Sequence, residues 1–131
     1  MNNLIQNRGA DLLPDQVEIV NNYLADLFVV RGKLDIFKMG DDEQQLPYEE
    51  LKDYVSDEME LLTDRLKRNG NDPVGSSEGV FQRSAIEVNE SFLWEDLNTL
   101  ATELRDNDLY LLNDAIEVYE NYSERLRTLE V

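Results

Sequence analysis

The sequence predicts an all-helical bundle. Apolar residues recur at spacings of three and four along several long segments, and no strand-like alternation interrupts them in the 131 residues. Proline and acidic residues where segments begin, and basic residues followed by glycine where one ends, mark helix boundaries. The length and an apolar content of 41 % suit one domain with a real core. We therefore expect residues 1–131 to form a single helical domain, with residues 1–13 as a flexible N-terminal segment.

The first helix is predicted from Pro14 to Phe37. Proline suits a first helical turn, and Asp15 and Glu18 favour the positive end of the helix dipole. Two adjacent apolar stripes are formed by Val17, Val20, Leu24, Leu27 and Leu34, and by Ile19, Tyr23 and Val30. So wide an apolar arc needs cover on more than one side, from its own bundle or from a neighbouring subunit.

The second helix is predicted to begin at Pro47, after a loop over residues 40–45. Its stripe consists of Tyr48, Leu51, Val55, Met59, Leu62 and Leu66. Lys67 and Arg68 end it, where cations oppose the negative end of the helix dipole, and Gly70 follows.

A long connection is predicted next, because residues 69–89 hold three of the six glycines. We expect a short helical turn near residues 80–83, a third helix from the N-cap Ser91 to about Asp106, and a last helix over 108–129. The last helix has two stripes, Leu109, Leu112, Ile116, Tyr119 and Leu126, and Leu111, Ala115, Val118, Tyr122 and Leu129. One long crossover between the second and third helices, with a shortened third helix, fits a ferritin-like four-helix bundle better than a simple up-and-down bundle.

Histidine and cysteine are both absent from the sequence. Without imidazole or thiol there is no Ser-His-Asp or Cys-His nucleophile, no ordinary zinc site and no near-neutral imidazole proton shuttle. Carboxylate chemistry, binding and assembly remain. We therefore favour a protein that is not an enzyme, and we expect no cofactor.

The net charge is −17, with 29 acidic and 12 basic residues. Such a chain repels phosphate backbones, so we expect no direct nucleic-acid partner. A basic protein or a cation fits better as a partner, although solubility alone commonly explains an acidic surface. No apolar run approaches the roughly 20 residues of a membrane span, and no signal peptide is visible, so a cytoplasmic location is the default expectation.

A row of carboxylates follows the second helix at spacings of 3, 4, 3 and 4. It consists of Glu50, Asp53, Asp57, Glu60 and Asp64, which share one face beside the apolar stripe. Like charges at these spacings cost about 0.2–0.5 kcal/mol per pair. The row is interpreted as a solvated face, a metal site, a salt-bridged interface or a surface that imitates spaced phosphates.

Several segments resemble a known family. Residues 24–30 (Leu-Ala-Asp-Leu-Phe-Val-Val), with Lys33 and Leu34, resemble the first helix of the miniferritins, the DNA-binding proteins from starved cells (Dps). Residues 48–51 and 64–76 resemble that family's second helix and its ending, in which Arg65, Gly70, Pro73 and Gly75 keep the family offsets. Residues 84–86 and 110–117 resemble a motif in the long connection and the last helix.

The resemblance implies an iron-oxidising site across a subunit dimer, with two histidines from one subunit and an acidic pair from the other. The acidic pair corresponds to Glu60 and Asp64, whereas the histidines correspond to Lys38 and Gln45. A charged lysine has no lone pair for a metal. We therefore expect a degenerate site that holds iron or another divalent cation weakly at most, with Lys38 facing Glu60 and Asp64 of a second subunit.

These expectations favour a Dps-like subunit that acts through assembly or binding, as a homodimer or larger homo-oligomer. The shortened third helix makes a closed iron-storing shell a weaker expectation. An acidic inhibitor that imitates nucleic acid and binds a basic partner is the alternative, and weak carboxylate-only iron storage is the third. Candidate interface residues are Lys38, Gln45, Glu50, Asp53, Asp57 and Trp94. Trp94 is interpreted as an interface anchor or as part of the core.

Overall fold

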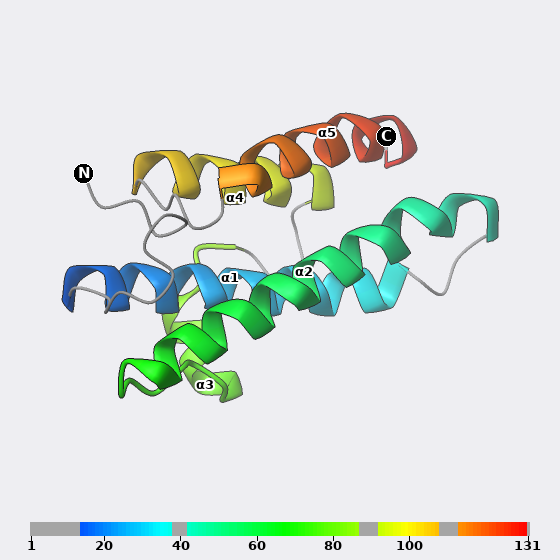
Figure 1. Cartoon of the computed structure of the whole chain (residues 1–131). Coiled ribbons are helices and arrows are strands. Elements are labelled where there is room, and N and C mark those ends of the chain that lie inside the picture. Colours follow the sequence, from blue (N-terminus) through cyan, green and yellow to red (C-terminus); the bar gives the residue numbers. More distant parts are fainter. Residues whose placement is uncertain (1–13, 38–41, 87–91, 108–112, 131) are drawn as a thin grey trace.

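The computed structural model describes residues 14–37, 42–86, 92–107 and 113–130. Within these ranges the chain is all-helical, with α1 (Pro14–Phe37), α2 (Asp42–Arg68), α3 (Ser77–Arg83), α4 (Leu93–Asp106) and α5 (Asn113–Leu129). Helix α1 packs against α2, and α4 packs against α5. Figure 1 shows these pairs as two layers, with α3 on the side of the α1–α2 layer that faces away from α4 and α5. The prediction of an all-helical fold is confirmed.

Helix α1 has the predicted bounds and the predicted wide apolar arc. Tyr23, Leu24, Leu27 and Leu34 are at most 1 % exposed. The helix contacts α2, α3 and α4, so three elements cover its two stripes. The bundle itself therefore supplies the cover that the pattern demands.

Helix α2 begins earlier than predicted, because residues 42–45 are helical rather than part of a loop. Pro47 lies inside the helix, near its start. A proline near a helix start removes one helical hydrogen bond and does not itself have to be the first helical residue. Pro47 therefore does not mark where α2 begins.

The other end of α2 closes as predicted. The backbone N–H of Gly70 donates to Lys67, and that of Asn71 donates to Leu66, at 3.0 and 2.9 Å. Gly70 has a φ of 76°, in the left-handed region that glycine tolerates best. This hydrogen-bond pattern is the Schellman motif, which satisfies the last helical carbonyl groups.

The connection between α2 and α4 contains a longer helix than predicted. Helix α3 begins at Ser77, and the Ser76 hydroxyl caps it by accepting the N–H of Gly79 at 3.0 Å. The prediction of Ser91 as the cap of the next helix is wrong, because Phe92 holds that position. Phe92 has no side-chain oxygen to cap the first helical N–H groups, and Glu95 instead accepts the backbone N–H of Phe92 itself at 3.3 Å.

Helix α5 ends at Leu129 as predicted, while residues 108–112 of the predicted helix lie outside the described residues. Ala115, Tyr119 and Leu126 are fully buried. Leu129 is 38 % exposed, so its assignment to a core stripe is wrong; the bundle no longer covers the helix end there. The buried apolar side chains of α1, α2, α4 and α5 form one core cluster, joined by Ile86 from the connection.

Candidate functional site

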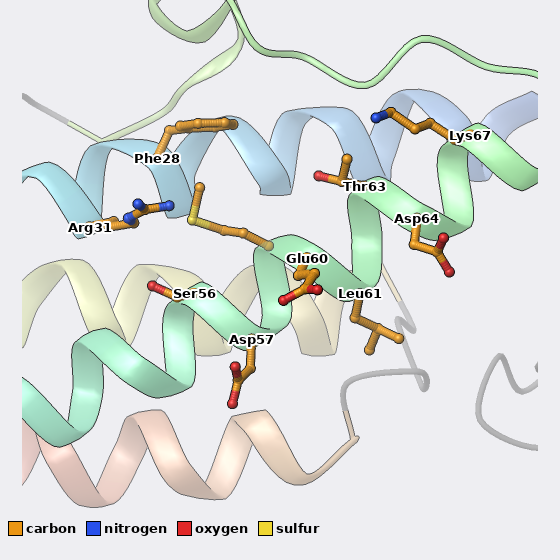
Figure 2. Close-up of a pocket in the computed structure, with 10 residues that line it drawn as sticks. Phe28, Arg31, Ser56, Asp57, Glu60, Leu61, Thr63, Asp64 and Lys67 are labelled. Carbon is orange, nitrogen blue, oxygen red and sulfur yellow. The ribbon is translucent and has the colours of Figure 1, made fainter.

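The α1–α2 groove, as we call it, is an open depression of about 760 Å³ between these helices. Phe28 and Arg31 line it from α1, and Leu61 and Lys67 are among its residues from α2. Figure 2 shows Arg31 beside Phe28, across from the side chains of α2. Apolar side chains and charges of both signs therefore share one recess in the exposed face of this layer.

Glu60 and Asp64, the predicted metal pair, both line the α1–α2 groove. Both are exposed. Asp64 forms an ion pair with Arg68 at 3.0 Å, so a cation of the same helix already offsets the charge of this carboxylate. Figure 2 shows the carboxylates of Asp57, Glu60 and Asp64 spread along α2 rather than gathered around a point. Within the described ranges, no three acidic, histidine or cysteine side chains are grouped as metal ligands.

The two ends of the predicted carboxylate row lie against different helices, α5 and α1. At one end, Glu50 accepts a hydrogen bond from Tyr122 of α5 at 2.7 Å, and Arg125 lies 4.0 Å away. At the other end, Asp57 lines the α1–α2 groove, while Asp53 between them is exposed. The crossing of α2 over the bundle (Figure 1) brings its two ends to different helices.

The two positions that correspond to the family's histidines remain predictions. Lys38 lies outside the described residues. Gln45 belongs to α2 rather than to the predicted loop, and its side chain is not described. The proposed contact of Lys38 with Glu60 and Asp64 of a second subunit is therefore untested.

Trp94 packs partly against the core rather than standing free on the surface. Its ring stacks on Phe92 with centroids 6.4 Å apart, and the Arg127 guanidinium lies 5.4 Å from its centroid. The backbone N–H of Trp94 donates to Glu130 at 3.1 Å. Its role as an interface anchor stays a prediction, while the partly buried side chain packs against the core.

A buried carboxylate in the bundle centre escaped the sequence analysis. Glu58 of α2 is 5 % exposed and accepts hydrogen bonds from Tyr23 of α1, at 3.3 Å, and from Tyr119 of α5. Its other oxygen, Oε2, has no hydrogen-bond partner among the described residues. Burial raises the pKa of Glu58 to about 7, although both phenol groups favour the ionised form. Tyr54 stands edge-on to Tyr119, with ring centroids 5.7 Å apart.

A second missed group joins α1, the long connection and α4. Asp26 is 1 % exposed and accepts the Ser84 hydroxyl at 2.6 Å and the backbone N–H of Ala85 at 2.8 Å. Glu103 of α4 lines the same small cavity as Asp26, and burial together with this neighbouring carboxyl raises the pKa of Glu103 to about 9. Asp26 fastens the connection to α1 through Ser84 and Ala85.

The interior also contains a buried ion pair. Lys33 of α1 donates to Asp96 of α4 at 2.7 Å, and their side chains are 8 and 3 % exposed. The sequence contained a signal for three of these residues. Asp26 follows Tyr23 of the α1 stripe after three residues, and Lys33 follows Asp26 after seven. Glu58 lies within the apolar stripe of α2. Polar residues inside an apolar stripe indicate buried partners.

Comparisons with known proteins do not identify a family for this chain. No protein-family model, curated protein or solved structure matches this chain. None of the helices in the described ranges is long and apolar enough to cross a bilayer.

Proposed function

We propose that this chain is a ferritin-like, Dps-related subunit that self-associates and does not oxidise iron. It acts through assembly or binding, and its α1–α2 groove is the face that meets a second copy. The observation that carries the proposal is the composition of this groove, in which Phe28 and Leu61 lie among charges of both signs. Protein interfaces likewise combine apolar side chains with polar and charged ones.

The charges of the groove support pairing of two copies. Arg31 and Lys67 offset most of the charge of Asp57, Glu60 and Asp64, in a chain with a net charge of −17. When two copies meet at this groove, cations of one can approach carboxylates of the other. Contacts elsewhere on so acidic a chain would mostly place carboxylates next to carboxylates.

The iron part of the proposal rests on the ligands. Glu60 and Asp64 are hard oxygen donors, which suit iron or other divalent cations only weakly without further ligands. Neither histidine of the family site is present, and Lys38 would carry its positive charge where the metal stood. The pairing of Lys38 with these two carboxylates belongs to the proposal.

Two measurements on the purified chain test this function. Light scattering is expected to give a mass of two chains or more, and anaerobic Fe²⁺ titration is expected to show no saturable binding below the millimolar range. A monomer overturns the assembly function. Tight iron binding instead identifies a working member of the ferritin-like proteins.

A substitution tests the lysine. Lys38→His is expected to strengthen Fe²⁺ binding by about tenfold or more, because imidazole offers the lone pair that ammonium lacks. Lys52→His is the matched control, since Lys52 pairs with Asp35 at 2.5 Å and does not line the α1–α2 groove. Equal iron binding by wild type and K38H refutes the role of Lys38.

The second candidate is an acidic mimic of nucleic acid. The observation that favours it is the exposure of Asp53, Asp57 and Glu60 along one face of α2. The pairing of Glu50 with Arg125 and of Asp64 with Arg68 shortens the row and weakens this candidate. A monomer that captures a basic protein at low salt and releases it at high salt would identify this function.

A further inference from the structure

The Asp26 cavity, as we call it, is a recess of about 220 Å³ between α1, the end of α3 and the end of α4. Asp26 of α1 and Glu103 of α4 both line it, together with Arg83 of α3. Asp26 is 1 % exposed, and Glu103 is partly buried. Two acids from separate helices therefore share a cavity that the proposed assembly does not use.

Asp26 is fixed in place, with one oxygen left for the cavity. Its Oδ1 accepts the Ser84 hydroxyl at 2.6 Å and the backbone N–H of Ala85 at 2.8 Å. Because both of these hydrogen bonds end on Oδ1, Oδ2 is the atom that can serve a molecule in the cavity. A concave site that holds a polar group in a defined orientation is typical of small-ligand sites.

The charge of the Asp26 cavity favours a cation as its ligand. Arg83 also lines the cavity, but its guanidinium already donates to Glu18 at 2.9 Å and to Asn22 at 3.1 Å. Burial and the neighbouring Asp26 raise the pKa of Glu103 to about 9, as expected for an acid beside another acid. A positively charged ligand supplies the counter-charge that these two acids share.

The other walls of the cavity suit an aliphatic chain better than a bare metal ion. Ile19 and Ala85 are apolar, and Tyr23 contributes its ring, since its hydroxyl donates to Glu58. Hard metal ions such as Ca²⁺ take six or more oxygen ligands. Over the part of the chain that the structure describes, no three acidic, histidine or cysteine side chains are grouped to provide them.

We propose that the Asp26 cavity binds the primary ammonium group of a small aliphatic amine. The ammonium lies between the carboxyl groups of Asp26 and Glu103, and the alkyl chain lies against Ile19 and Tyr23. The three N–H donors of the ammonium meet these two acids and the amide oxygen of Asn107, whose amide nitrogen already donates to the backbone of Glu103 at 2.9 Å. This site does not depend on self-association.

Calorimetric titration of the purified chain with butylamine tests the site. Physiological ionic strength screens general attraction to the acidic surface, and butylamine stays protonated at about pH 8.5, as a lysine does. Butylamine is expected to bind saturably and about tenfold or more tightly than tetramethylammonium, which has the same charge and no N–H donor. The absence of saturable binding, or equal binding of the two cations, overturns the inference.

Variants locate the binding. Glu103→Gln removes one carboxylate and Ala85→Leu fills the cavity, and each is expected to weaken butylamine binding about tenfold or more. Neither residue is fully buried, and helical circular dichroism checks that both variants fold. Glu124→Gln, an exposed acid of α5 that does not line the cavity, is the matched control and is expected to leave binding unchanged. Equal weakening by Glu103→Gln and Glu124→Gln shows attraction to net charge alone and refutes the site.

The pH dependence gives a second readout. Glu103 must lose its proton to receive the ammonium, so the affinity for butylamine is expected to rise about tenfold or more between about pH 7 and about pH 8.5. The ionisable groups that face Glu103 in the cavity are Asp26, Tyr23 and Arg83, and burial raises the pKa of Tyr23 well above this range. Glu103→Gln is expected to flatten the rise, and Arg83→Ala is expected to retain it.

A competing cation separates the amine from a metal ion. Ca²⁺ is expected to leave butylamine binding unchanged apart from the effect of ionic strength, which an equal ionic strength of NaCl reproduces. Ca²⁺ that binds at Glu103 and excludes butylamine identifies a metal site and overturns the amine assignment.

Discussion

Glu58 and Glu60 are two residues apart on α2 and belong to different environments. Glu58 points into the bundle, accepts two tyrosine hydroxyls and has a pKa of about 7. Glu60 lies exposed beside the α1–α2 groove. The 29 acidic residues of this chain therefore include two classes of carboxylate, buried and exposed, which composition alone does not distinguish. The outer class faces solvent, and the inner class makes hydrogen bonds within the bundle.

The largest effect is expected from the buried ion pair. Asp96→Leu removes the carboxylate that lies 2.7 Å from the Lys33 ammonium, while the cation stays buried. We expect a loss of about 3 kcal/mol in the free energy of unfolding, measured by urea denaturation. The double variant Lys33→Met/Asp96→Leu is expected to regain most of the loss, and an additive loss would contradict this account.

The next effect concerns Glu58 and depends on pH. Its folded pKa, about 7, lies above the ordinary value of 4.5, so the folded state holds this proton more tightly than the unfolded state does. The stabilisation is complete below pH 4.5 and is lost as the pH rises through 7. Glu58→Gln stays neutral, and we expect its gain in unfolding free energy to be about 2 kcal/mol larger at pH 8 than at pH 5. A gain that does not vary with pH would contradict burial as the cause.

A smaller effect is expected from Glu103 beside Asp26, at higher pH, because Glu103 is only partly buried and solvent screens its interactions. The pKa of Glu103, about 9 in the folded state, is raised from 4.5, so its contribution to stability declines as the pH rises toward 9. Glu103→Gln is expected to remove this decline in a series of thermal melts between pH 7 and about 10. Arg83 lines the same small cavity and pairs with Glu18, and Arg83→Ala is the control for that cation. An identical decline in the Glu103→Gln variant would refute the raised pKa of Glu103 as the cause.

The smallest effect is expected in the outer class. Asp57→Asn relieves the repulsion from Asp53 and Glu60, and we expect a gain of about 0.5 kcal/mol at low ionic strength. The gain is expected to shrink in high salt, because exposed charges are screened. Asp64→Asn is the matched control, since it also loses the ion pair with Arg68 at 3.0 Å and so gains less. Equal gains in both variants would show that the row acts only through net charge.

Local signals explain which parts of the fold were predicted. Pro14 and the acidic residues after it mark the start of α1, and Gly70 with a φ of 76° marks the turn after α2. The start of α4 was misplaced by one residue, because the cap position is held by Phe92, whose backbone N–H donates to Glu95 and whose side chain makes no capping hydrogen bond. The start of α2 was misplaced because a proline was taken as the first helical residue.

The candidate site was predicted only in part. The spacing placed Glu60 and Asp64 on one face, and both do line one groove. The periodicity of α2 alone contains no information on Phe28 and Arg31, which complete that groove from α1. The identification of Lys38 and Gln45 as former ligand positions depends on the resemblance and stays a prediction.

By itself, the sequence determined that this chain is helical, where α1 begins and where its helices end, and which catalytic classes its missing histidine and cysteine exclude. Only the tertiary structure decided which carboxylates are buried and which face water. The physical reason is that periodicity assigns a residue to a face of its own helix, whereas burial and pKa depend on what other helices bring to that face. Tyr23 and Tyr119 reach Glu58 from helices far away in sequence, and no local pattern specifies that meeting.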